Sequence, residues 1–421
     1  MTKYFGIGMT STRSRLLVGL VAVSSAAVTA CGSGSSTAAT STISIGAQLP
    51  LTGTLASYGA NVLTGVDTGL HEVNSNGGVR GQKLALTVQD DGGDAVDALP
   101  AFRTLLLSHP VAIFGLISNT FPSVATEFDQ NHIVDFGLLG GTAFYKLPYK
   151  YVYHAVVADP SVGSAMADYA ISSSWTQCSA IFGADASSQT LSQAVLGPYQ
   201  THGGTVLADV SVTPAQSSYR SELAVAFAKH PQCLFLQTDP TTSKTLFADA
   251  SQLGYANVPI IGSDEFVGAD ECTAIGGAIA SKYLTGVAEA APNSPAVTHY
   301  AAIYQQLYHT TPTSQQAGLY DSVIIAALAM TAANSTNPQV WNPFVRKVTG
   351  GSGEVVYTYA AGVAALKAGK QIRYSGAYTS NWDYNQYGDV FTDFDMSQYD
   401  ATCTTAHSVF HITAADVAKF G

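Results

Sequence analysis

Charged side chains are scarce in this chain. They make up 11% of its 421 residues, against a usual value of about 25%, so Ser, Thr, Asn, Gln and Gly must supply much of the surface polarity. The 18 Lys and Arg residues are outnumbered by 29 Asp and Glu, and the formal net charge is −11. Phosphate binding needs clustered cations, which this composition does not favour, so we expect no nucleic-acid partner.

Catalytic and metal-binding motifs are also absent from the sequence. It contains no GxSxG elbow, no GxxxxGK[ST] loop and no HExxH pair. His407 and His411 are four residues apart, but "HSVFHI" alternates like a strand and does not give the ligand geometry of a helix face. We therefore expect no metal, no cofactor and no enzymatic activity; a secreted hydrolase is the disfavoured alternative.

No apolar run near the amino terminus has the roughly 20 residues of a membrane span. Lys3, Arg13 and Arg15 precede the short apolar run 16–28, which is typical of a secretory signal. The run leads into Val-Thr-Ala-Cys31, which resembles the lipobox of bacterial lipoproteins; a simple secretory signal with a chance cysteine is the alternative. We expect a signal peptide at 1–30, lipidation at Cys31 and a flexible tether over 31–42.

Short β-branched runs then alternate with stretches at helical spacing. We expect a first set of strands, separated by helices, at "TISIGAQL", "KLALTVQ", "VAIFGL" and "HIVDFGLL". The pattern then restarts with "CSAIFGA", "TVLADVSV", "CLFLQT" and "VPIIGS". Such alternation favours right-handed βαβ units with a parallel sheet covered on both faces. At 421 residues the chain exceeds the size of one core, so the sequence predicts an α/β fold with two doubly wound, parallel-sheet lobes.

Four cysteines remain once Cys31 is assigned to lipidation. An even number in an oxidising compartment predicts two disulfides, with three possible connectivities. Cys178 and Cys233 begin the first and third strands of the second unit, which are neighbours in the common 2-1-3-4-5 strand order. This order favours pairing Cys178 with Cys233, which leaves Cys272 with Cys403, while the other connectivities stay open.

The acidic, glycine-rich stretch "QDDGGDA" invites a calcium-site interpretation. An EF-hand loop needs ligands at alternate positions and a Glu at its end, and this stretch has neither. We instead expect Asp90 and Asp91 to end a strand, Gly92 and Gly93 to turn the chain, and Asp94 to cap the next helix.

Four segments of the sequence carry a family resemblance: "IGAQLPLTGTLASYGANVLTGVDTGLHEVNSNGGVRGQKLALTVQDDGGD", "VAIFGLISNTFPSVAT", "VPIIGSDEF" and "YSGAYTSNWDYNQYGDV". Together they resemble the type I periplasmic binding proteins of the leucine/isoleucine/valine-binding family. The resemblance implies a Venus-flytrap fold in which two lobes are joined by three crossovers, here near Val157, Ala288 and Phe391. It divides the chain into lobe 1 (43–157 and 288–390) and lobe 2 (158–287 and 391–421), with Cys272 and Cys403 both in lobe 2.

Ligands of open α/β sheets sit beyond the carboxyl ends of the strands. Two loops of lobe 1 have this position, Ser118-Asn119-Thr120 and Gly140-Gly141-Thr142; the alternative is that they are plain turns or caps. The resemblance implies that Asn119 and Thr142 hold a ligand carboxylate, that the Gly140 carbonyl receives an ammonium group, and that Tyr58 lines the pocket.

The same resemblance assigns the counter-charge for the ammonium group to Asp264 of lobe 2, with Glu265 as the fallback. Two positions that are aromatic in amino-acid-binding members fall near Ser187 and Asp239, and the cysteines of a lobe 1 disulfide would fall near Gly93 and Ser118. This more polar second wall disfavours leucine-like ligands and leaves a polar amino acid, an amide or another small carboxylate.

The resemblance implies a monomeric, lipid-anchored receptor in the bacterial cell envelope. It would bind a small molecule and deliver it to an ABC permease and ATPase complex. The alternative is a sensory lipoprotein that reports the ligand to a membrane signalling partner, and the sequence does not separate these two functions.

Overall fold

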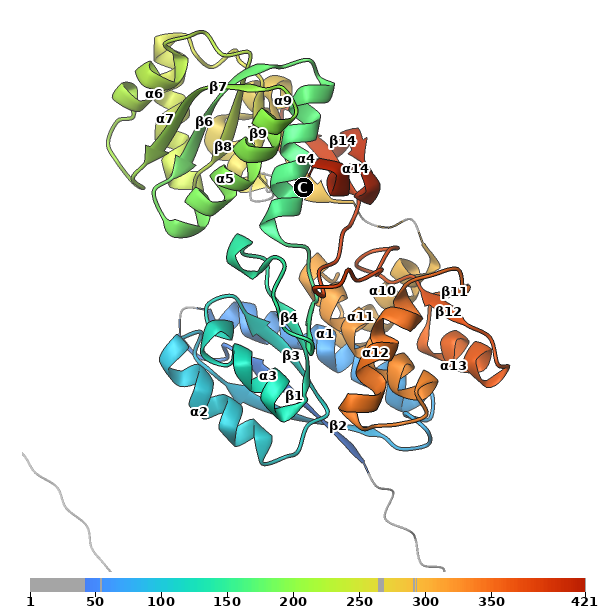
Figure 1. The fold of residues 1–421 in the computed structure, drawn as a ribbon. Coiled ribbons are helices and arrows are strands. Elements are labelled where there is room, and N and C mark those ends of the chain that lie inside the picture. Colours follow the sequence, from blue (N-terminus) through green and yellow to red (C-terminus); the bar gives the residue numbers. More distant parts are fainter. Residues whose placement is uncertain (1–41, 54, 264–268, 291, 293, 421) are drawn as a thin grey trace, which may run out of the picture. The chain divides into compact units, whose positions relative to one another are not determined.

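The computed structural model describes residues 42–53, 55–263, 269–290, 292 and 294–420. It contains a five-stranded and a seven-stranded sheet, each covered by helices, and a separate two-stranded ribbon (Figure 1). The predicted α/β class and the two doubly wound sheets are confirmed. The expected signal peptide, Cys31, the tether apart from Thr42, and Asp264 and Glu265 lie outside the described residues.

The five-stranded sheet has the order β2-β1-β3-β4-β5 and is parallel throughout. Residues of α1 and α11 (Ser314–Ala332) pack on one face, and residues of α2 and α3 pack on the other. Because both faces are covered, β3 and β4 are wholly buried. β3 is a continuous apolar run, whereas β4 also contains the buried Asp135. The elements are β1 (Ile43–Leu49), α1 (Ala56–Ser75), β2 (Leu84–Asp90), α2 (Ala95–Leu106), β3 (Ala112–Ile117), η1 (Phe121–Ser123), α3 (Ala125–Asn131), β4 (Val134–Leu138), η2 (Thr142–Phe144) and β5 (Val152–His154).

The seven-stranded sheet has the order β14-β13-β10-β9-β8-β6-β7. Its five strands from β7 to β10 follow the predicted 2-1-3-4-5 order and are parallel, whereas β13 and β14 are antiparallel additions. This sheet is therefore mixed, because the carboxyl-terminal segment enters it as a hairpin. The elements are α4 (Asp159–Ser172), β6 (Gln177–Gly183), α5 (Ala186–Thr201), β7 (Thr205–Val212), α6 (Arg220–Phe227), β8 (Cys233–Gln237), α7 (Pro240–Leu253), β9 (Ile260–Gly262), α8 (Ala269–Ile275), α9 (Gly277–Tyr283), β10 (Leu284–Glu289), β13 (Phe394–Tyr399), β14 (Ala406–Ile412) and α14 (Ala414–Phe420).

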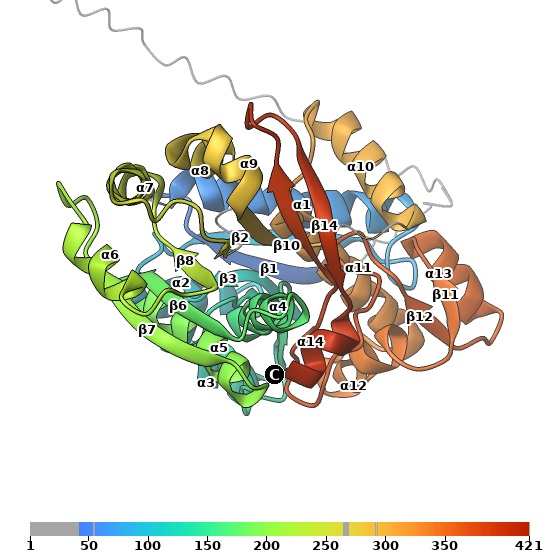
Figure 2. The ribbon, with the colours of Figure 1, turned by 90° about the horizontal axis from the view of Figure 1, so that it is seen from above.

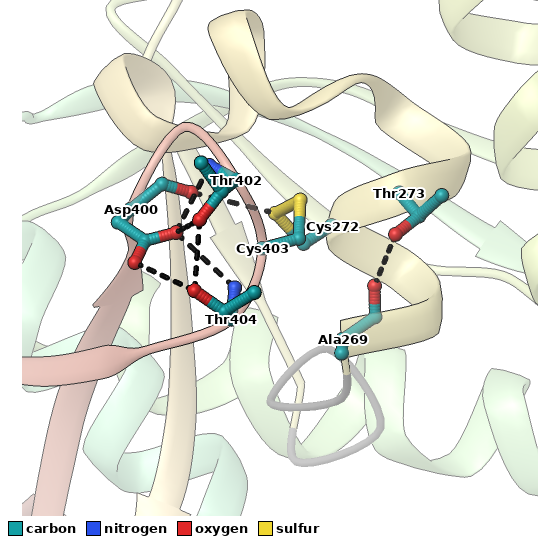
Figure 3. Close-up of a disulfide and its surroundings, with 7 residues drawn as sticks. All are labelled: Ala269, Cys272, Thr273, Asp400, Thr402, Cys403 and Thr404. Atoms are coloured by element: carbon teal, nitrogen blue, oxygen red, sulfur yellow. Dashed lines mark hydrogen bonds between the residues drawn. A yellow bond between two sulfur atoms is a disulfide. The ribbon is translucent and has the colours of Figure 1, made fainter.

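Both disulfides have the favoured connectivity. Cys178 of β6 and Cys233 of β8 are register partners on adjacent strands and are bonded to each other. Cys272 of α8 is bonded to Cys403 in the turn between β13 and β14 (Figure 3). In that turn the carboxylate of Asp400 accepts backbone N–H groups from Thr402 and Thr404, so the hairpin is fixed both covalently and by hydrogen bonds.

The residues between β10 and β13 add three helices around α11 and a short ribbon. Helix α11 is buried from Gln316 to Met330, all but its first two and last two residues, and it packs against α1, α12 and α13. Figures 1 and 2 both place α12, β11, β12 and α13 next to one another. The elements are α10 (Pro295–Tyr308), α11 (Ser314–Ala332), α12 (Pro338–Thr349), β11 (Glu354–Val356), α13 (Tyr359–Lys367) and β12 (Ile372–Tyr374).

The acidic, glycine-rich stretch has the predicted structural role. Strand β2 ends at Asp90, and Gly92 and Gly93 both adopt positive φ angles, which suit residues without a Cβ. The Asp94 side chain accepts the N–H of Val96 and caps α2. Within the described residues, no helix combines the length and apolarity that a membrane crossing requires.

Candidate functional site

The two predicted loops of the five-stranded sheet lie beside each other. They follow β3 and β4, which are adjacent parallel strands, so their carboxyl ends meet at one edge. The hydroxyl of Ser118 accepts the backbone N–H of Gly141 at 3.4 Å. The structure therefore brings together the Ser118–Thr120 and Gly140–Thr142 loops.

Thr142 has the most distinctive chemistry in these loops. It begins η2, and its hydroxyl oxygen is buried without a hydrogen-bond partner among the described residues. Buried hydroxyl groups normally have a partner, and leaving one without costs about 1–3 kcal/mol. An orphan hydroxyl at the carboxyl ends of parallel strands is suited to donate to a ligand.

The neighbouring loop residues divide between structural and exposed positions. Thr120 is buried, and both its backbone N–H and its hydroxyl donate to the carbonyl of Ile117, at 3.1 and 3.4 Å. Asn119 is exposed. The Gly140 carbonyl accepts the N–H of Asp159, the first residue of α4, at 2.6 Å. A carbonyl oxygen has two lone pairs, so the predicted ammonium contact at Gly140 stays a prediction.

Tyr58 lies on α1 and is half-buried against the main apolar core. Burial raises the pKa of its hydroxyl to about 12, so this side chain is neutral at physiological pH. Its predicted role in lining the pocket is not tested by any contact in the structure.

The seven-stranded sheet has a second group of polar residues at the carboxyl ends of its parallel strands. They line a cavity of about 200 Å³. Ser187 and Asp239, predicted from different segments, both contribute to its wall. The lining residues are Gly183, Asp185, Ser187, Ser188, Val212, Pro214, Gln237, Thr238, Asp239 and Thr242.

Two carboxylates of this cavity are N-caps of the helices that follow the adjacent strands β6 and β8. Asp185 caps α5 by accepting the N–H of Ser188, and Asp239 caps α7 by accepting from Thr241 and Thr242. Burial opposes ionisation of each carboxyl group, but the hydrogen bonds from the helix residues outweigh it and hold both pKa values below the usual value. The cavity wall is therefore negatively charged at neutral pH.

Gln237 is a residue that the sequence did not single out. It ends β8, is 6% exposed and lines the cavity, and its amide oxygen has no partner among the described residues. Ser263, directly before the predicted acids Asp264 and Glu265, likewise has a buried hydroxyl without a described partner. Applying the rule of strand carboxyl ends to "FGADASS" and "LQTDPTT" would have identified Asp185 and Gln237.

Comparison with known proteins agrees with this arrangement. The model of the family described as periplasmic binding protein matches residues 42–342. The chain belongs to the periplasmic binding protein family. Curated relatives of the family include the Leu/Ile/Val-binding protein BraC3 of Rhizobium johnstonii, 41% identical over 14% of this chain and 16% of its own length, and Leu/Ile/Val-binding protein homolog 8 of Brucella suis, 32% identical over 31% of each chain. These alignments span less than a third of the relatives' length.

Solved structures of periplasmic binding proteins share the whole fold. A branched-chain amino acid ABC transporter periplasmic ligand-binding protein of Burkholderia xenovorans superposes with a TM-score of 0.72 at 14% identity, covering 90% of this chain and 97% of that one. LivJ of Streptococcus pneumoniae, solved in complex with isoleucine, gives 0.65 at 16% identity and covers 88% and 99%. The leucine-binding LivK of Thermotoga maritima gives 0.66 at 18% identity and covers 89% and 99%.

Proposed function

We propose that the chain is the extracytoplasmic solute-binding lipoprotein of an ABC importer. In this proposal it binds a small polar metabolite between two lobes and presents it to a membrane permease. The observation that carries the proposal is the buried amide oxygen of Gln237, which has no hydrogen-bond partner among the described residues and lies in a cavity also lined by Asp185 and Asp239. These groups accept hydrogen bonds, so they select a ligand with N–H donors.

The five-stranded sheet supplies complementary chemistry. The Thr142 hydroxyl can donate to a ligand carboxylate, and Ser118, Asn119 and Gly141 lie in the same pair of loops. The ligand would then place its carboxylate toward lobe 1 and its nitrogen groups toward lobe 2. The solved relatives include complexes with isoleucine and leucine. The polar second wall favours a polar amino acid or an amide here.

The proposed lobes are 43–157 with 288–390, and 158–287 with 391–421. Contacts at the crossovers support this division. The Tyr378 hydroxyl accepts the N–H of Val157 at 2.9 Å and donates to Glu289 at 3.3 Å, so one side chain joins two crossover segments. The second crossover, near Ala288, lies in β10, and the third, near Phe391, leads into β13. These two strands pair with each other, so the third crossover is held beside the second.

Lobe closure would provide the affinity. Micromolar binding needs about −8 kcal/mol, and a ligand of about ten heavy atoms reaches this value only when it is largely enclosed. A permease could then distinguish the closed, loaded form from the open one. No chemical step is required, so we expect binding without turnover.

The signal sequence and Cys31 support attachment to the outer face of the cell membrane through a lipid. Replacing Cys31 with Ala should release the processed protein from the membrane fraction of cells that express the full chain. Continued retention of the Cys31→Ala protein in that fraction would contradict lipidation at this residue.

The proposed ligand class can be tested by a thermal-shift screen. Residues 41–421 form one compact unit, so the experiment can use residues 32–421. A ligand that binds only the folded state raises the melting temperature. We expect shifts with polar amino acids or small amides and smaller shifts with leucine; shifts with leucine alone would contradict the polar assignment.

A further inference from the structure

The structure concentrates positive charge on one part of an acidic molecule. Five of the 18 Lys and Arg residues lie within 346–373, where Glu354 is the only acid, so this segment has a net charge of +4 while the whole chain has −11. The remainder therefore carries −15. The segment includes only the last four residues of α12, together with β11, α13 and most of β12. The whole of α12 and these elements form what we call the basic face. Its cations are Arg346, Lys347, Lys367, Lys370 and Arg373.

Four of these five cations have no ion pair among the described residues, although Arg346 donates to the backbone carbonyls of Asn385 and Gln386 and the Asp383 carboxylate lies beside Gly350. Lys370 pairs with Glu354 at 2.6 Å. Lys347 and Lys367 are exposed, and within the described part of the chain neither has an ion pair. Lys347 instead lies over the ring of Phe344, with Nζ 4.1 Å from the ring centroid. The charge on this face thus remains available to an external anion.

A cavity of about 570 Å³ lies between these elements. Arg346, Lys347 and Lys370 are among its lining residues, together with the loop Gly350–Gly353. The loop carries three glycines and Ser352, so little side-chain volume blocks access to the cations. The cavity is large enough for a phosphate-bearing head group.

The exposed surface of α12 is amphipathic. Val340 is 45% exposed, and Phe344 and Lys347 follow at spacings of four and three residues, which places all three along one helix face. Val355 on β11 is also exposed, at 36%. Apolar side chains beside lysines are typical of segments that lie in the head-group layer of a bilayer. In water alone, the exposed valine side chains would gain no stabilisation.

We propose that the basic face is a docking surface for the anionic lipid surface of a membrane. Cations attract such a surface with a contribution of about fivefold in affinity each at low ionic strength. The −15 carried by the remainder is repelled, so the charge separation orients the molecule with α12 and α13 toward the lipid. Lipid tethering at Cys31, itself part of the proposed function, would hold the basic face near the membrane, so that even a weak interaction between them is populated.

Vesicle co-sedimentation of residues 32–421 tests the proposal without the lipid anchor, so its result is independent of lipidation and of solute binding. At about 20 mM salt, we expect binding to vesicles of phosphatidylcholine with phosphatidylglycerol and none to phosphatidylcholine alone. High salt should abolish the binding. Replacing Lys347, Lys367 and Lys370 with Gln should weaken it at least about tenfold.

The matched control replaces Lys229, Lys244 and Lys282 with Gln, which changes the net charge equally at exposed positions elsewhere. Equal weakening in both triple variants, or no binding of the unmodified protein to anionic vesicles, would overturn the proposal. So would full displacement by inorganic phosphate at constant ionic strength, because that result would identify a small-anion site. A circular-dichroism melt of each variant establishes that it is folded.

Discussion

The indole N–H of Trp382 donates to a carboxylate oxygen of Asp321 at 3.0 Å, deep in the molecule. The same carboxylate accepts the Tyr374 hydroxyl at 2.6 Å and the backbone N–H groups of Ala377 and Tyr378 at 3.0 and 2.7 Å. One side chain of α11 thus fixes the aromatic segment 374–382. Tyr378 of this segment in turn accepts the backbone N–H of Val157 at the proposed first crossover.

Replacing Asp321 with Ala should destabilise the protein by about 3–5 kcal/mol, because four buried donors lose their acceptor. Burial raises the pKa of Asp321 to about 6, although its four hydrogen bonds oppose the shift. A folded-state pKa above the unfolded value of about 3.9 means that the stabilising contribution falls as pH rises from about 4 to about 6.

The difference in urea-unfolding free energy between the unmodified protein and Asp321→Ala should therefore shrink over this pH range. Asp383→Ala, at an exposed position in the same segment, is the control and should change little. A difference that grows with pH would contradict the direction of the Asp321 pKa.

Replacing Thr142 with Val should weaken ligand binding without lowering the stability of the free protein. Valine has the same shape but lacks the hydroxyl that the described structure leaves unpartnered. We expect the free protein to be as stable or up to about 1 kcal/mol more stable, and ligand binding to weaken about tenfold. Calorimetric titration and thermal unfolding measure the two effects; lower stability with unchanged binding would assign Thr142 to the scaffold.

Replacing Gln237 with Leu should reduce the preference for polar ligands. The buried amide oxygen would be lost from the cavity, so binding of an N–H-rich ligand should weaken by about 1–3 kcal/mol, whereas any binding of leucine should weaken less. Gln200→Leu, on an exposed position of α5, is the control. Equal losses for both ligand types would exclude a selective role for Gln237.

Replacing His299 with Gln should reveal a pH-dependent contact between α10 and α1. His299 Nε2 lies 3.1 Å from an oxygen of the buried Glu72, which also accepts the Tyr320 hydroxyl and the Tyr359 N–H. The hydrogen bond to Glu72 raises the pKa of His299 although burial opposes it. Burial also opposes ionisation of Glu72, but these hydrogen bonds, His299 first, lower its pKa.

A raised histidine pKa gives stability that is present at low pH and lost as pH rises through the folded-state value. The melting temperature of His299→Gln should therefore fall further below that of the unmodified protein at pH 6 than at pH 8.5. His71→Gln, on the exposed side of α1, is the matched control. Equal differences at both pH values would show that the contact does not titrate.

The sequence predicted the parts of the fold that have a strong local signal. Long apolar strands such as β3 and β8 were predicted, and Cys178 and Cys233 were paired because they begin neighbouring strands. The two strands β11 and β12 have three residues each and show no usable period. The stretch between "VAIFGL" and "HIVDFGLL" was expected to be helical, but it is divided into η1 and α3, because Pro122 opens a separate short turn.

The candidate site was predicted less completely, for a physical reason. Positions after strands are visible in a sequence, and Thr142 lies in a loop named in that way. Ser187 and Asp239 were named through the family resemblance, and the structure places these two in one cavity. An unpartnered buried group such as the Gln237 oxygen exists only once every neighbour is in place. Asp264 and Glu265 stay predictions, because they lie outside the described residues.

The hairpin β13–β14 also affects how the protein is made. Strand β10 pairs with β13 on one side, and β13 comes about a hundred residues later in the chain. One edge of β10 therefore stays unpaired until β13 has been synthesised, and an unpaired strand edge can associate with other chains. Cys272 likewise waits for Cys403. A chain lacking its last thirty residues would therefore expose both a free strand edge and a free thiol.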